Sequence, residues 1–188
     1  MRTDFTVNRD ALEARLGKKR AEHVMGAAKT AAELARRYGV DADKAERAAL
    51  LHDWFRGASL SELDALIDVY GLDHSLKGDA NLSHGPVAAA FMERELGVTD
   101  AELLDAVRYH TTGRAGMSEL EKILYAADAA EPSRDYDGVS ELRETAEKDL
   151  NAACRAALEN TLRRLSEKGR TPDPASLRAL EWFNGLNN

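Results

Sequence analysis

The stretch Lys18–Tyr38, KKRAEHVMGAAKTAAELARRY, decides the fold class of this 188-residue chain. Its apolar residues recur at spacings of three and four, at Ala21, Val24, Ala28, Ala31, Leu34, Ala35 and Tyr38. This spacing puts them on one face of an α-helix, and the following Gly39 is a typical residue beyond a helix C-terminus. The stretch therefore predicts a long amphipathic helix with one buried face.

Helix signals repeat along the rest of the chain. Ser59 with Glu62, Thr99 with Glu102 and Ser118 with Glu121 have the spacing of capping boxes, which open helices. Asp41 is expected to cap a helix that ends at His52–Asp53, and Ser83 one that ends at Gly97 with Pro86 in its first turn. Residues 71–82 are rich in turn-forming types and predict a long loop.

The C-terminal part predicts two further helices. A long one spans Val139–Lys168, with an apolar stripe at Leu142, Ala146, Leu150, Ala153 and Ala157. Asp173 and Pro174 begin a short terminal helix. No repeat or Gly/Ser linker divides the sequence, so we expect one all-α domain over residues 1–188.

Composition supports the same class. Alanine and leucine together number 56, whereas valine and isoleucine, which favour strands, number 10. With 44% hydrophobic residues the chain is too apolar for a disordered protein, and its net charge of −7 does not suggest a general nucleic-acid binder.

Other features bear on location. The longest apolar run, PVAAAFM, is far shorter than the ~20 residues of a membrane span, and the opening MRTDFTVNRD lacks the apolar core of a signal peptide. The single Cys154 cannot form an internal disulfide, which fits a reducing compartment. We therefore expect a cytoplasmic protein.

The residues with distinctive chemistry are histidines and aspartates at helix positions. They are His23, His52, Asp53, His84, His110 and Asp128. Each alone is typical of an ordinary polar residue. Together they are hard to explain as core residues, because burying uncompensated imidazoles and carboxylates costs several kcal/mol each. A metal cluster removes this penalty, and imidazole with carboxylate suits iron, manganese, zinc, cobalt or nickel.

The order of these residues is that of the HD-domain metal phosphohydrolases. Four longer strings closely resemble the YqeK branch of that superfamily: LLHDWFRG (50–57), LSHGPVAAAFMERELGV (82–98), LLDAVRYHTTGRAGMSELEKILYAADAAEPSR (103–134) and ALENTLRRLSEKG (157–169). The resemblance extends from about Arg20 to Asn184. It implies a single helical HD domain with a metal-binding core at about 18–135 and C-terminal helices at about 138–186.

The resemblance also implies an activity, the symmetrical hydrolysis of diadenosine tetraphosphate into two ADP. It assigns His23, His52, Asp53 and Asp128 to a first metal. Asp53 would bridge to a second metal that His84 and His110 complete. Asp53 and Asp128 are then the catalytic carboxylates, and the cofactors are two divalent transition-metal ions, iron first among the candidates.

Three arginines are predicted to bind substrate phosphate. Arg56 stands where relatives commonly have lysine, Arg114 follows His110 closely, and Arg134 lies one or two helical turns beyond Asp128. The expected partner is a small nucleotide, with no nucleic acid and no membrane, and the chain is a monomer or homodimer. His74 is expected to be exposed, and core packing is favoured for Trp54 over stacking on a base.

Three other functions stay open at this point. A metal phosphohydrolase that acts on a mononucleotide or a cyclic dinucleotide would need the same ligands, and only the pocket walls would differ. An oxygenase would use a pair of irons to activate oxygen. A non-catalytic regulator would use the metal to fix the fold or bind a partner, but the arginines beside the ligands argue against it.

Overall fold

The computed structural model describes residues 7–186. Within them the chain forms ten α-helices and one short 3-10 helix and has no strand, which confirms the all-α class. The elements are α1 (Arg9–Leu16), α2 (Lys18–Tyr38), α3 (Ala42–His52), α4 (Leu60–Tyr70), η1 (His74–Leu76), α5 (Ala80–Arg94), α6 (Ala101–Tyr109), α7 (Glu119–Ala130), α8 (Val139–Lys148), α9 (Leu150–Glu167) and α10 (Pro174–Gly185).

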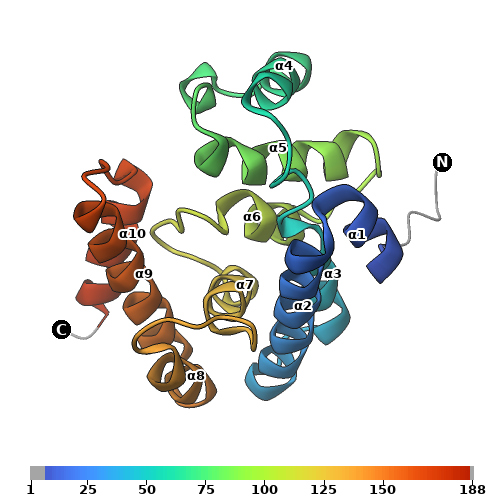
Figure 1. Ribbon diagram of the computed structural model, residues 1–188. Coiled ribbons are helices and arrows are strands. Elements are labelled where there is room, and N and C mark those ends of the chain that lie inside the picture. Colours follow the sequence, from blue (N-terminus) through green and yellow to red (C-terminus); the bar gives the residue numbers. More distant parts are fainter. Residues whose placement is uncertain (1–6, 187–188) are drawn as a thin grey trace.

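Helix α7 lies at the centre of the bundle. It packs against α2 and α3 on one side and against α8 and α9 on the other, while α6 crosses one of its ends (Figure 1). Helices α4 and α5 form the top of the molecule in that view and pack on each other. Nine of the twelve α7 residues are buried, which is the burial expected of a helix surrounded by others.

Small residues allow α2 and α3 to pack closely. Ala21, Ala28, Ala31 and Ala35 on α2 are buried, as are Ala45, Ala48 and Ala49 on α3. Alanine brings little volume between two helix axes and is also the strongest helix former. The apolar face that the sequence predicts for Lys18–Tyr38 is therefore the buried face of α2, which packs against α3.

Several predicted helix starts are confirmed. The Asp41 side chain accepts hydrogen bonds from the backbone N–H groups of Asp43 and Lys44. Ser118 and Glu121 form a complete capping box. Asp173 caps α10, with Pro174 in its first turn.

Two predicted starts are wrong by a few residues. Helix α5 begins at Ala80, because the Asp79 carboxylate accepts from the N–H groups of Asn81 and Leu82 and so starts the helix before Ser83. Pro86 therefore lies inside the helix and not in its first turn. Helix α6 is capped by Asp100 and not by Thr99. In both places a nearby aspartate, four residues before Ser83 and one residue after Thr99, caps the helix instead.

The predicted helix Val139–Lys168 is broken at Asp149. This residue is extended, with φ −148° and ψ 104°, and its side chain caps α9 by accepting from Ala152 N. A short polar side chain that binds the backbone in this way favours a helix start over a helix interior. The apolar stripe is nevertheless buried on both segments, so the predicted face is right and the predicted continuity is wrong.

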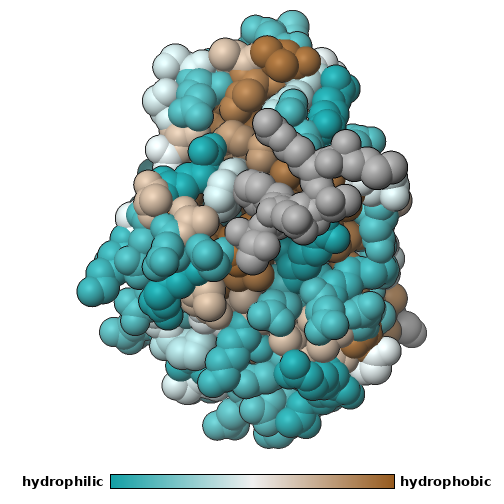
Figure 2. Space-filling view, turned by 90° about the vertical axis from the view of Figure 1, so that its right-hand side faces the viewer, coloured by the Kyte–Doolittle hydropathy of each residue, from teal (hydrophilic) through white to brown (hydrophobic). Residues whose placement is uncertain are grey.

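The face of the molecule beside α1 is mainly polar. Figure 2 shows the face beside α1 covered largely by hydrophilic side chains, with apolar ones gathered toward the α4 end. Leu60 and Val69 of α4 are among the exposed large hydrophobic residues, and Val69 is 69% exposed. No helix within residues 7–186 combines the length and the apolarity that a membrane crossing needs.

Candidate metal centre

Four buried imidazoles meet where four helices converge. His23 lies in α2 and His84 in α5, His52 is the last residue of α3, and His110 follows α6 as its C-cap. All four side chains are at most 7% exposed. The bundle thus collects in its interior the side chains that the sequence spreads over 88 residues.

Each imidazole is held by its Nδ1 atom, which leaves Nε2 facing the centre. The Nδ1 atoms of His52, His84 and His110 lie 2.5, 3.0 and 2.7 Å from the carbonyl oxygens of Ala49, Ala80 and Val107. His23 Nδ1 lies 3.0 Å from Glu131 Oε1. Since a carbonyl or carboxylate can only accept, each Nδ1 carries the proton. Metal-ligating histidines are oriented in the same way.

Asp53 lies between two pairs of these rings. Its Oδ1 is 3.2 Å from His84 Nε2 and 3.8 Å from His110 Nε2. Its Oδ2 is 3.6 Å from both His23 Nε2 and His52 Nε2. One carboxylate therefore serves two separate triads, His23–His52–Asp53 and Asp53–His84–His110, each compact enough to hold a metal ion.

Asp128 completes the first triad from α7. Its Oδ1 is 3.1 Å from His23 Nε2 and 3.9 Å from His52 Nε2. The side chain interrupts the apolar second half of α7, and it points into the centre because α7 faces α2 and α3.

The donor atoms of this centre are better suited to binding cations than to contacting one another. Within the described residues, the buried His52 Nε2 has no hydrogen-bond partner, and His23 Nε2 faces the carboxylates of Asp53 and Asp128. The Nε2 atoms of His84 and His110 lie 3.0 Å apart, although both rings already carry their proton on Nδ1. Two facing lone pairs repel, and a cation between or beside them removes that repulsion. The residues present therefore fit two metal ions.

The protonation states agree with this picture for most ligands. Despite burial, the nearby imidazoles hold the pKa of Asp53 well below its usual value, and His23, Arg134 and His52 do the same for Asp128. Burial and the neighbouring rings of His84 and His52 lower the pKa of His110 to about 3, so that ring is neutral. These are the forms that coordinate a metal.

His23 differs from the other ligands. Burial lowers its pKa, but the carboxylates of Asp128 and Glu131 outweigh burial and raise the pKa to about 9. In the metal-free protein His23 is therefore protonated at neutral pH and supplies the positive charge between these carboxylates. A metal ion has to displace this proton.

Two glycines allow the close approaches in the centre. A Cβ atom on Gly26 would lie 2.5 Å from Glu131 Oε2, so glycine makes room for the carboxylate that holds His23. A Cβ atom on Gly85 would lie 3.0 Å from Val107 O and 3.1 Å from His110 Cε1. Glycine at this position therefore lets α5 and α6 approach until His84 and His110 meet.

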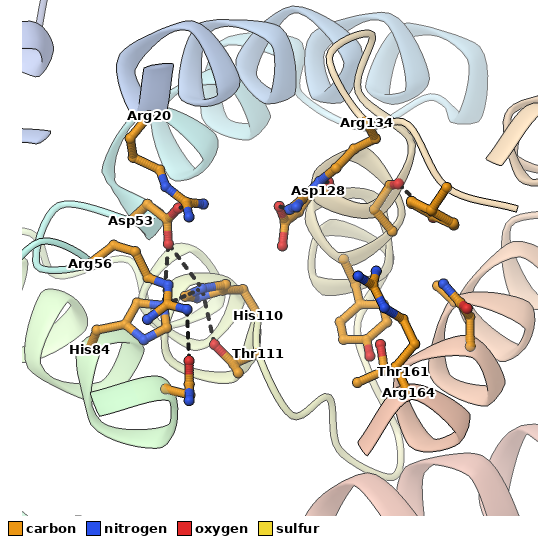
Figure 3. Close-up of a pocket in the computed structure, with 16 residues that line it drawn as sticks. Arg20, Asp53, Arg56, His84, His110, Thr111, Asp128, Arg134, Thr161 and Arg164 are labelled. Carbon is orange, nitrogen blue, oxygen red and sulfur yellow. Dashed lines mark hydrogen bonds and ion pairs between the residues drawn. The ribbon is translucent and has the colours of Figure 1, made fainter. Parts of the chain in front are cut away.

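A pocket of about 250 Å³ opens onto this centre. Asp53, His84, His110 and Asp128 line it together with four arginines, Arg20, Arg56, Arg134 and Arg164. Figure 3 shows Arg56, His84 and Asp53 on one side of the cavity and Arg164 on the other, with Asp128 between the two sides. A cationic pocket above a metal centre is suited to a phosphorylated ligand.

Two of the arginines hold the aspartates in place. Arg20 donates to Asp53 Oδ2 over 3.0 Å, and Arg134 donates to the backbone oxygen of Asp128 over 2.8 Å and also to its carboxylate. Charge-assisted bonds of this kind fix the direction of each carboxylate.

Comparison with known proteins decides the family. Residues 20–133, which carry all six clustered His and Asp side chains, match the model of the HD domain. The chain belongs to the HD-domain family. The resemblance seen in the sequence is thereby confirmed.

Similar HD-domain proteins carry specific names. A symmetrical bis(5′-nucleosyl)-tetraphosphatase of Bacillus subtilis is 40% identical over 92% of this chain and 93% of its own. One of Halalkalibacterium halodurans is also 40% identical, over 86% and 87%. A crystal structure of a Clostridium acetobutylicum protein, described as a predicted HD superfamily hydrolase involved in NAD metabolism, is 34% identical, covers 95% of both chains and superposes with a TM-score of 0.89.

The structure of this HD-domain protein brings together all six predicted ligands, and Arg56 and Arg134 line the pocket beside them. Arg114 does not line this pocket. Its guanidinium donates two hydrogen bonds to the buried carboxylate of Glu121, over 2.6 and 2.8 Å. The prediction that Arg114 binds phosphate therefore gains no support, because tertiary packing supplies a carboxylate partner seven residues away.

Other minor predictions can be placed too. His74 is exposed and lies 3.1 Å from Asp68 Oδ1, and Trp54 and Cys154 are buried in the core. Sequence reasoning missed Arg20, Arg164 and the role of Glu131. Arg20 had a usable signal, because it precedes His23 by three residues and so lies on the same helix face. The other two are far from the residues they approach, and the sequence gives no comparable signal for them.

Proposed function

We propose that this HD-domain protein hydrolyses diadenosine tetraphosphate symmetrically into two ADP, with two divalent transition-metal ions as cofactors. The observation that carries the proposal is Asp53, whose two oxygens face two imidazole pairs at the floor of an arginine-lined pocket. The names of the 40% identical relatives from Bacillus subtilis and Halalkalibacterium halodurans support the choice of substrate.

The distances between the side chains support one ligand set. His23, His52, Asp53 and Asp128 would hold the first metal, and Asp53, His84 and His110 the second. Nitrogen and oxygen donors without thiolate suit iron, manganese, cobalt, nickel or zinc, and we propose iron as the first candidate. When bound, two such ions lower the pKa of water to near neutrality and offset charge that develops on phosphoryl oxygens.

The chain's own residues supply orientation. Asp53, oriented by Arg20, would bind both metal ions, and Asp128, oriented by Arg134, would bind the first one. Arg56 faces the pocket with its guanidinium donating only to a neutral group, Asn81 Oδ1, over 2.7 Å. It can therefore bind a phosphate without losing an ion pair.

The leaving group does not need an acid from the protein. Cleavage between the two central phosphorus atoms releases the terminal phosphate of ADP, whose second pKa is about 6. At about 250 Å³ the pocket is smaller than most sites that enclose a drug-sized ligand, ~300–1,000 Å³. It is suited to the phosphate chain, with the two nucleosides at its margin.

Product analysis tests the proposal. Purified protein, with its metal content measured, is incubated with dinucleoside polyphosphates of several chain lengths and with mononucleotides. We expect ADP as the sole product from diadenosine tetraphosphate. A single turnover in heavy-oxygen water should place one label on the terminal phosphate of one of the two ADP molecules, since water attacks one phosphorus.

Other outcomes would change the proposal. AMP with ATP as products would show attack on an outer phosphorus. Fast hydrolysis of a mononucleotide without cleavage of diadenosine tetraphosphate would indicate a general nucleotide phosphohydrolase. A cytoplasmic location and a monomeric or homodimeric state stay predictions.

A further inference from the structure

One wall of the pocket is built by residues beyond the HD-domain match, which ends at residue 133. The wall consists of Tyr136, Ala157, Asn160, Thr161 and Arg164. Four of these lie on α9 at spacings of three, four and seven, which is one face of a helix. The chain turns at Asp149 between α8 and α9, and α9 packs against α7 (Figure 1). The α9 face with these four residues borders the pocket.

The four arginines of the pocket differ in their partners. Arg20 and Arg134 are paired with Asp53 and Asp128. Within residues 7–186, Arg56 and Arg164 form no ion pair with a carboxylate. They are therefore the uncompensated positive charges of the pocket, in a protein whose net charge is −7.

These two charges stand on opposite sides of the metal centre. Figure 3 shows Arg56 beside His84 and Asp53, and Arg164 across the cavity beside Thr161, with Asp128 between the two sides. A phosphate chain laid over the centre would meet one guanidinium at each end. A guanidinium binds phosphate through two parallel hydrogen bonds, so it is suited to this role.

The guanidinium of Arg164 packs against an aromatic ring. Its guanidinium carbon lies 5.7 Å from the ring centroid of Tyr136, and the hydroxyl of Tyr136 donates to Ala129 O over 2.8 Å. The neighbouring Arg163 does not line this pocket, and it pairs with Glu167 Oε1 over 2.6 Å and donates to Asn160 Oδ1 over 2.7 Å. The two adjacent arginines thus have different roles on α9.

We infer that Arg164 binds a phosphate of one ADP half of the substrate while Arg56 binds a phosphate of the other half. This inference rests on the proposed function, and it makes α9 the part of the chain that selects substrates with phosphate on both sides of the cleaved bond. A ligand with a single phosphate fills only the centre and does not reach Arg164.

Equilibrium binding tests the role of Arg164 without turnover. ADP and inorganic phosphate are titrated by calorimetry into the metal-loaded wild type and into R164Q, R164K and the matched control R163Q. Losing a charge-assisted bond to phosphate should weaken one of the two ADP sites by about 10- to 100-fold in R164Q, while the site at Arg56 keeps its affinity. R164K should recover part of the loss because it keeps the charge. R163Q should bind ADP as the wild type does.

Inorganic phosphate separates this role from a structural one. Its affinity should be the same in R164Q and the wild type, because it occupies the metal centre alone, and melting temperatures should agree. In turnover, R164Q should raise KM for diadenosine tetraphosphate more than it lowers kcat.

The inference is overturned if R164Q binds ADP at both sites as tightly as R163Q, if ADP and inorganic phosphate weaken equally, or if the wild type does not bind ADP. The failure of this inference can be distinguished from the failure of the proposed function. A wild type that binds ADP through Arg164 but does not cleave diadenosine tetraphosphate would refute the proposed function alone.

Discussion

Replacing Gly85 by alanine should separate α5 from α6 and weaken the second metal site. The new Cβ would lie 3.0 Å from Val107 O, 3.1 Å from Arg108 O and 3.1 Å from His110 Cε1. Two of these atoms are backbone carbonyls and cannot rotate away. Val107 O also lies 2.7 Å from His110 Nδ1, so a shift of this carbonyl turns the His110 ring.

The magnitude follows from two opposing effects. Overpacking a close contact costs ~1–3 kcal/mol, while alanine improves helix propensity over glycine by ~0.8–1.0 kcal/mol. The net loss of unfolding free energy is then ~0–2 kcal/mol, or a fall in Tm of up to about 8 °C for a chain of this size. Disturbing the support of a metal ligand costs about 10- to 100-fold in affinity.

Metal titration with a competing chelator, together with thermal melting, measures both effects. We expect G85A to keep the first metal and to bind the second 10- to 100-fold more weakly. Gly185 is the matched control, because its Cβ position has no heavy atom within 4 Å. If G85A binds two metals with wild-type affinity and melts no lower than G185A, the close contact does not set the geometry of the centre.

Three further predictions concern single side chains. D53A should lose both metals, because the two oxygens of Asp53 face both imidazole pairs. H84A should lose mainly the second metal and keep its helical circular dichroism. Metal analysis of the two variants checks these expectations. Metal uptake at pH 7 should release about one proton from His23, whose pKa is about 9 in the metal-free protein, and the metal affinity should rise with pH up to about 9. An indicator dye counts the released protons, and no proton release at pH 7 would contradict this prediction. R114A should lower the unfolding free energy by ~1–3 kcal/mol, because it removes the ion-pair partner of the buried Glu121. Its kcat/KM should stay near the wild-type value, and a large loss of kcat/KM would indicate that Arg114 binds substrate phosphate after all.

Local features of the helices were predictable because they depend on near neighbours. The buried face of α2 follows from apolar spacing, and the caps at Asp41, Ser118 and Asp173 follow from side chains that bind the next few N–H groups. The errors at Ser83 and Thr99 arose where two cap residues compete within a few positions.

The chemistry of the centre was also predictable from the sequence, since imidazoles and carboxylates in apolar helices need a common partner. The residue types alone did not indicate how they are grouped; the family resemblance implied two groups, and the tertiary structure brings the residues together in those groups. The two oxygens of Asp53 divide four rings into two pairs, and this depends on distances between helices that no spacing along the chain encodes.

The arginines show most clearly that the sequence alone does not indicate which charged residues the fold brings together. Arg114 follows a predicted ligand closely in sequence, yet it pairs with Glu121, while Arg164, 54 residues beyond His110, lines the pocket. The sequence determined which residues carry charge and which helix faces are buried, because both are local properties. The packing of α7 and α9, set by the break at Asp149, decided which charges reach the metal centre, because a guanidinium binds whichever anion the fold brings within hydrogen-bond distance.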